Sequence, residues 1–137
     1  MPSNFKNPRG EACLCILDDL LNDVYSIRQV CDLFTKGSHH CNISVILITH
    51  NIFHQDRHCR DISLNAKYQI FLKNVRDRSQ FSRVAQQVYP QNIEALYASY
   101  LQATARPHGY IVLDLMQGIN DLLRLRTAIF RTRVPPP

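Results

Sequence analysis

The sequence predicts an α/β fold in which a mostly parallel sheet carries flanking helices and ends in a hairpin at its C-terminal edge. Two runs, 12–17 and 43–49, are apolar at both alternating positions, as expected for strands buried on both faces of a parallel sheet. Between them, residues 22–35 carry apolar side chains at spacings of three and four, which predicts a helix. A strand, a helix and a strand in this order predict a crossover unit.

The elements that follow extend this sheet. The polar stretch 55–61 predicts a loop, and 68–72 predicts a third, shorter parallel strand. Asp77 and Gln80 have the spacing of a capping box, and they predict a helix that Pro90 ends. The last elements are a helix, a strand, a turn and the second strand of an edge hairpin, at 92–104, 110–115, 118–121 and 122–130.

Length and composition limit the class of protein. The 137 residues, of which 45% are hydrophobic and 20% charged, fit one domain with a packed core. We expect a disordered leader over 1–11, this domain over 12–130 and a disordered tail over 131–137. Apolar runs fall far short of the roughly 20 residues of a membrane helix, and no signal peptide opens the chain. An intracellular protein is expected, with the nucleus and the cytoplasm both open.

Charge and cysteine usage add two further expectations. The net charge of +5 permits a polyanionic partner such as DNA. The five cysteines include no Cys-x-x-Cys pair, so reduced thiols fit best. A zinc site drawn from the histidines and cysteines is the weaker interpretation, because its members are adjacent or fall in an apparent loop: His39, His40, Cys41, His54, His58 and Cys59.

The pair Asp18 and Asp19 ends the first predicted strand and has the pattern of a Walker B site. In such a site the first carboxylate holds Mg²⁺ through water, and the second orients or deprotonates the attacking water. Ligands of parallel sheets bind beyond the carboxyl ends of strands, where this pair lies. The alternative is that Asp18 or Asp19 caps the turn that follows.

Two more polar groups follow predicted strands. Thr49, His50 and Asn51 come after the second strand, where a side chain can contact a phosphate or the attacking water; a plain strand-to-loop transition explains them equally well. Arg76 and Arg78 follow the third strand, where an arginine finger can reach a nucleotide held by an adjacent subunit. The alternative for these two cations is solvated surface.

The sequence contains no phosphate-binding loop. Such a loop requires the pattern Gly-x-x-x-x-Gly-Lys-Ser/Thr, so that backbone amides can surround the phosphates. The chain has only four glycines, and none of them opens this pattern. The sequence printed above therefore lacks the main phosphate cradle of a nucleotide site.

Several blocks together resemble one family. In chain order they are CLCILDD, DLFTKGSHH, ISVILITHNIF, ISLNAKY, KNVRDRSQ, RPHGY and LRLRTAIF. They are similar to the carboxyl-terminal portion of viral genome-packaging ATPases in the FtsK/HerA branch of P-loop NTPases. The likeness is greatest to the poxvirus-like enzymes of large DNA viruses and Maverick/Polinton-type elements, and it covers about 12–130.

The resemblance implies an oligomeric motor that hydrolyses ATP to move double-stranded DNA. Asp18 would be the Mg²⁺-site acid and Asp19 the catalytic acid. His50 stands where the family usually has a glutamine that senses the γ-phosphate, which is a departure from the pattern. Arg76 and Arg78 stand where an arginine acting on the neighbouring subunit is plausible.

The resemblance also implies a missing half. In this family the P-loop strand would lie between the strands at 43–49 and 68–72. We therefore expect a fragment, a product of gene truncation or a subunit completed by another chain. In the isolated chain we expect weak or absent binding of ATP and Mg²⁺, and no hydrolysis. The two flanking strands are expected to pair directly and close the gap.

A second function is compatible with the same residues. A non-enzymatic DNA-associated or oligomer-interacting module would use surface cations of the last strand. Arg124 and Arg126 alternate there with Leu123 and Leu125, as expected for a strand with one charged face.

Overall fold

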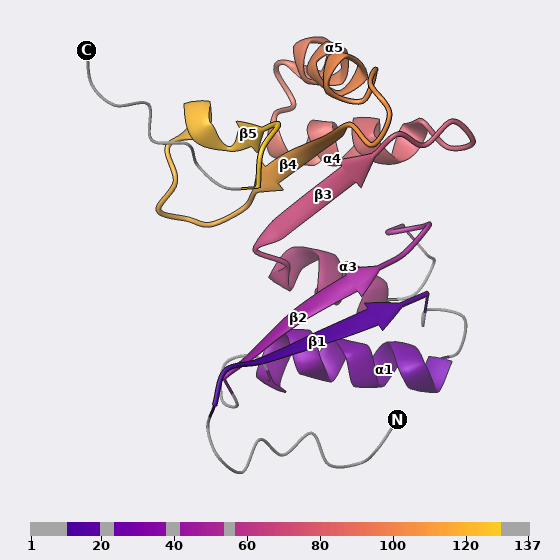
Figure 1. The fold of residues 1–137 in the computed structure, drawn as a ribbon, viewed down its shortest axis with the longest axis vertical. Coiled ribbons are helices and arrows are strands. Elements are labelled where there is room, and N and C mark those ends of the chain that lie inside the picture. Colours follow the sequence, from indigo (N-terminus) through magenta and orange to yellow (C-terminus); the bar gives the residue numbers. More distant parts are fainter. Residues whose placement is uncertain (1–10, 20–23, 38–41, 54–56, 130–137) are drawn as a thin grey trace. The chain divides into compact units, whose positions relative to one another are not determined.

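The computed structural model describes residues 11–19, 24–37, 42–53 and 57–129 (Figure 1). Residue contacts group the chain into two compact units, Met1–Ala66 and Lys67–Pro137, and each is described by itself. Except for Glu11, the leader expected over 1–11 lies outside the described residues, as does the whole tail expected over 131–137. The single domain over 12–130 remains a prediction.

The first unit contains the expected parallel strand pair. Strand β1 (Cys13–Asp18) pairs in parallel with β2 (Ile43–Ile48), and the register runs from Cys13 opposite Ile43 to Asp18 opposite Ile48. The connection between them contains helix α1 (Val24–Asp32), which continues into one turn of π-helix, η1 (Leu33–Gly37). The predicted strand–helix–strand order and the parallel pairing are confirmed.

A further helix, α3 (Arg57–Asn65), corrects the expected loop at 55–61. Only two of its side chains, Cys59 and Ile62, are buried hydrophobic groups, and they are three residues apart. This spacing places both on one helical face, against the core. The residues around these two positions are strongly polar, so the sequence shows too little apolar periodicity to predict a helix here.

One face of the β1–β2 sheet forms the core of the first unit. Its side chains pack with residues of α1, η1 and α3, all on the same side of the two strands (Figure 1). The buried members of this cluster are Leu17, Val30, Cys31, Leu33, Cys59 and Ile62.

The opposite face of the same sheet is exposed. Leu14, Ile16, Ile46 and Ile48 are between 46% and 58% exposed. Within the first unit, the expectation that both faces of these strands are buried is therefore wrong. We call these four residues the open apolar face.

The second unit is an antiparallel sheet covered by two helices. Strand β3 (Tyr68–Leu72) pairs with β4 (Tyr110–Asp114), and β4 pairs with β5 (Leu125–Arg126), both antiparallel. Helices α4 (Ser79–Val88) and α5 (Ile93–Ala103) connect β3 to β4, and a 3-10 turn, η2 (Asp121–Leu123), precedes β5.

This arrangement corrects two expectations. The sheet is not mostly parallel, because two helices in succession bring the chain back in the direction opposite to β3, whereas a single crossover helix gives a parallel strand. Strands β2 and β3 belong to different sheets, so they do not pair directly. The α/β class holds, and the C-terminal hairpin is present with a second strand much shorter than 122–130.

Aromatic side chains hold the core of the second unit. Phe81 of α4 stacks on Tyr100 of α5, with ring centroids 4.5 Å apart, and meets Phe71 of β3 edge-on at 5.2 Å. Ile111 of β4, 1% exposed, completes the contact between the helices and the sheet. Such aromatic pairs add specific geometry to the burial of apolar area.

Candidate functional site

The carboxyl edge of the β1–β2 sheet brings together the two polar groups that follow these strands. The ladder ends with Asp18 opposite Ile48. One further bond, from the Asp19 backbone N–H to the Ile48 carbonyl at 3.0 Å, carries the pairing past the end of the strand. Both acids therefore lie beside the segment that begins at Thr49, as the sequence predicts. We call this the β1–β2 carboxyl edge.

Asp19 has a left-handed backbone. Its φ angle is 48°, in the region that L-residues other than glycine, asparagine and aspartate rarely enter. The chain turns sharply here, directly after the exposed carboxylate of Asp18. The side chains of 18 and 19 are thus displayed by two different backbone conformations, extended and left-handed.

The side chains of Thr49 and Asn51 fold back on their own loop. The Thr49 hydroxyl accepts the Asn51 backbone N–H at 3.2 Å and lies 3.3 Å from the Asn51 carbonyl. The Asn51 side-chain oxygen accepts the Phe53 N–H at 2.9 Å, an Asx turn. These bonds shape the start of the loop after β2, and His50, which is exposed, lies between Thr49 and Asn51.

Arg76 and Arg78 belong to the second unit, in the loop between β3 and α4. The loop is built on Asn74, whose side-chain oxygen accepts the N–H groups of Arg76 and Asp77, each at 3.0 Å. The Asn74 N–H donates in turn to the Tyr100 hydroxyl at 3.1 Å, which ties the loop to α5. Both arginines are exposed.

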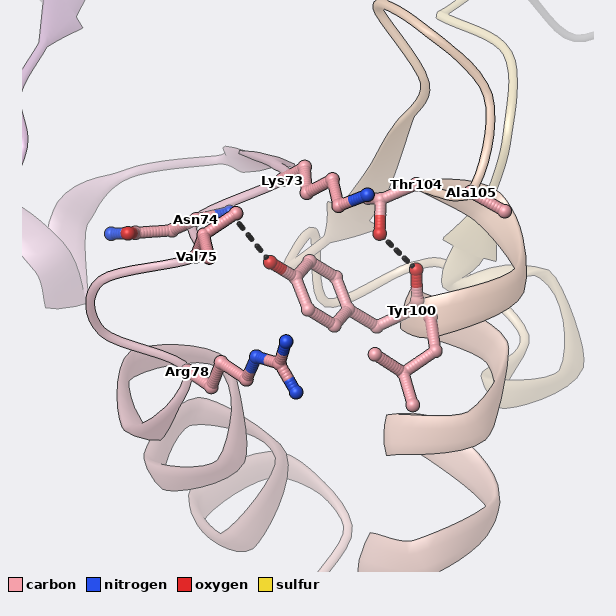
Figure 2. Close-up of a pocket in the computed structure, with 8 residues that line it drawn as sticks. Lys73, Asn74, Val75, Arg78, Tyr100, Thr104 and Ala105 are labelled. Carbon is pink, nitrogen blue, oxygen red and sulfur yellow. Dashed lines mark hydrogen bonds between the residues drawn. The ribbon is translucent and has the colours of Figure 1, made fainter.

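A shallow pocket of about 300 Å³ lies beneath this loop (Figure 2). Figure 2 shows the Arg78 guanidinium directed into it, beside the Tyr100 ring. The Tyr100 hydroxyl also donates to the Leu72 carbonyl at 3.1 Å, and the Thr104 hydroxyl donates to the Tyr100 carbonyl at 2.8 Å. Hydrogen bonds therefore hold Tyr100 in the pocket wall, and two cations, Lys73 and Arg78, line the pocket.

Asp77 does not form the expected capping box, because the N-cap residue of α4 is Arg78 and Asp77 bonds the first turn from one residue earlier. Its carboxylate accepts the Ser79 backbone N–H at 3.0 Å, the Ser79 hydroxyl at 2.6 Å and the Gln80 side-chain amide at 3.1 Å. These bonds lower the pKa of Asp77, with the Ser79 side chain as the largest cause and Gln80 next. The Gln80 amide thus donates to the Asp77 carboxylate, and the Asp77 N–H, which a capping box would direct to Gln80, donates to Asn74.

The two arginines expected on the last strand are partly buried, and β5 contains only the second of them, Arg126. Arg126 forms an ion pair with the buried Asp114 at 3.0 Å, and Arg124 pairs with Asp121 at 2.6 Å. Their side chains are only 15% and 18% exposed. Both cations are thus engaged in ion pairs within this unit, and their expected role in a surface for DNA stays a prediction.

The zinc interpretation changes in the structure. His39, His40, Cys41 and His54 lie outside the described residues. The other two expected residues are His58 and Cys59. His58 lies beside Cys31 and Asp61, and one ligand atom of each of these three residues lies within 4.8 Å of the others. Neither Cys31 nor Asp61 was expected as a ligand from the sequence. The helix that brings His58 and Asp61 to one face was expected to be a loop.

No family model, curated protein or solved structure matches this chain significantly. Among the described residues, no helix combines the length and the apolar character required to cross a bilayer. The similarity to packaging ATPases thus remains a prediction from the sequence blocks.

Proposed function

We propose that the β1–β2 carboxyl edge is the magnesium and water-activating edge of an ATPase domain of the DNA-packaging type. The observation that carries the proposal is the parallel register, which puts Asp18 and Asp19 beside the polar segment after β2. A Walker B strand next to a sensor strand requires this adjacency.

The donor set fits the proposed ion. Mg²⁺ prefers oxygen ligands, keeps several of its waters and is usually bound by one or two carboxylates together with substrate phosphates. Asp18 would hold the hydrated ion and Asp19 would orient the attacking water, while bound Mg²⁺ would offset the charge of the phosphates. His50, exposed in the adjacent loop, would contact the γ-phosphate, with Thr49 and Asn51 fixing that loop.

The phosphate cradle has to be supplied by another segment or another chain. The printed sequence contains no P-loop pattern. The open apolar face supports a covering partner, because large apolar side chains gathered on one exposed face mark an interaction surface. In this proposal the assembled motor acts on double-stranded DNA, and Arg76 or Arg78 serves a nucleotide on a neighbouring subunit.

Calorimetric titration of the purified chain with Mg²⁺ and ATP tests the proposal. We expect weak binding that requires both components, and no steady turnover. Asp18→Asn should weaken the Mg²⁺-dependent part at least about tenfold, because one acid supplies most of the ion's protein contact. Asp32→Asn, which changes an exposed carboxylate of α1 in the same unit, is the matched control.

Two results would count against this function. If Asp18→Asn and Asp32→Asn weakened the Mg²⁺-dependent binding equally, the binding would depend only on the net charge of the protein and not on a site at Asp18. Micromolar ATP affinity with steady turnover by the chain alone would show that it needs no outside phosphate cradle.

A further inference from the structure

We propose that Cys31, His58 and Asp61 form a binding site for a zinc-class divalent ion. The three residues offer a sulfur, a nitrogen and an oxygen atom, and these ligand atoms all lie within 4.8 Å of one another. The site is separate from the proposed magnesium edge and does not depend on that function.

The scaffold of this site consists of two packed helices. Cys31 is in the last turn of α1, while His58 and Asp61 are three residues apart on α3, a spacing that puts both on one helical face. Buried neighbours fix the two helices: Val30 on α1 is 0% exposed and Ile62 on α3 is 5% exposed. Ligands on rigid, packed helices are held in place more accurately than ligands on loops.

The donor chemistry selects the class of ion. Thiolate, imidazole and carboxylate are the three side-chain ligands of zinc in proteins. Mg²⁺ and Ca²⁺ take oxygen ligands, so a site with one sulfur and one nitrogen disfavours them. An ion bound here is therefore chemically distinct from the ion proposed for Asp18.

Burial changes across the site in a way that suits entry of an ion. Cys31 is buried, His58 is half-buried and Asp61 is exposed. The soft ligand is thus the most buried of the three and the carboxylate the most exposed, so the site meets solvent at Asp61. With zinc–ligand bonds of about 2.0–2.3 Å, ligand atoms lie about 3.5 Å apart in a tetrahedron, so small side-chain rotations suffice to close the site.

Three protein ligands leave one position of a tetrahedron for water or another group. Binding converts the Cys31 thiol to a thiolate and releases one proton to solvent, while the imidazole of His58 binds as the neutral form and Asp61 as the carboxylate. The S–H bond breaks, the sulfur–metal bond forms, and no oxidant or reductant is involved.

Cobalt titration of the reduced, chelator-treated full chain tests the site. We expect one equivalent of Co²⁺ to produce near-ultraviolet thiolate-to-cobalt charge-transfer absorption, and Zn²⁺ to displace it. Cys31→Ala should abolish the band. Cys59→Ala removes an equally buried thiol from the same core cluster and should leave the band unchanged.

A second variant guards against loss of folding. Asp61 is exposed, so Asp61→Asn should fold normally and weaken Co²⁺ affinity at least as much as loss of an outer-shell partner does, about 10–100-fold. Absence of the band in the native chain would overturn the proposal. So would a band that survives Cys31→Ala, or an affinity unchanged by Asp61→Asn.

Discussion

The Asp77 carboxylate collects three hydrogen bonds at the start of α4, and this makes stability depend on pH. Because the bonds lower its pKa in the folded state, its stabilising contribution is complete above the unfolded-state pKa and is lost as pH falls through the folded-state value. We expect Asp77→Asn to reduce the loss of stability on acidification below about pH 4. Urea unfolding of both proteins at a series of pH values measures this difference in the free energy of unfolding.

The control for this prediction is Glu94→Gln, which changes an exposed carboxylate in the first turn of α5. An identical change in the acid-side slope for both variants would show that the hydrogen bonds of Asp77 are not its source.

A buried ion pair is the second determinant at the residue scale. Asp114 is 1% exposed, and Arg126 is the cation that neutralises it. Arg126→Met would remove the ion-pair partner of this buried carboxylate, and breaking a buried pair in this way typically costs about 3–5 kcal/mol, so we expect a loss of about that size in the free energy of unfolding. Denaturant titration against Arg106→Met, a change at an exposed arginine, provides the comparison.

The pair also makes a prediction about coupling. Adding Asp114→Asn to Arg126→Met should recover part of the lost stability, because the amide carries no charge. A double variant as unstable as the sum of both single changes would contradict an ion-pair role.

At the scale of elements, local pattern predicted more than long-range pairing did. The strands β1, β2 and β3 could be predicted as short apolar runs, and α4 could be predicted from the spacing of Asp77 and Gln80. The orientation of β4 against β3 depends on how many helices lie between them, and no local pattern encodes which strands of a sheet become neighbours. The position of Asp18 could be predicted because it lies at the end of a predicted strand. The cluster of Cys31, His58 and Asp61 could not, because it depends on α3, which was expected to be a loop.

The turn between α5 and β4 depends on a glycine. A Cβ atom at Gly109 would lie 2.3 Å from the Ala103 carbonyl oxygen and 3.0 Å from that of Arg106, both backbone atoms. We expect Gly109→Ala to destabilise the protein by more than about 1 kcal/mol, because the backbone of the turn has to shift.

Gly118→Ala is the matched control, since nothing lies within 4 Å of the added atom. Thermal unfolding followed by circular dichroism compares the two variants. Equal midpoints would show that the turn at Gly109 has room for a side chain.

At the scale of the whole molecule, the open apolar face predicts association. Leu14, Ile16, Ile46 and Ile48 lie on one side of a two-stranded sheet whose outer backbone edges also invite pairing. We expect the purified chain to self-associate with rising concentration. The double variant Ile16→Thr, Ile46→Thr should shift sedimentation toward the monomer.

A polar change elsewhere is the control for association. Leu64 on α3 is 70% exposed but lies outside the sheet, so Leu64→Thr should leave sedimentation unchanged. A monomer at all concentrations for the unmodified chain would show that the face does not drive association.

The left-handed backbone at position 19 has a consequence for selection in a library of variants. Glycine and asparagine would satisfy the turn and lose the carboxylate, whereas glutamate would keep the charge in a conformation it adopts poorly. Screening for folding would then enrich glycine, while screening for the proposed activity would admit only aspartate. Such a result would show that the left-handed backbone and the carboxylate are two separate requirements at position 19. β-Branched residues would be depleted in both screens.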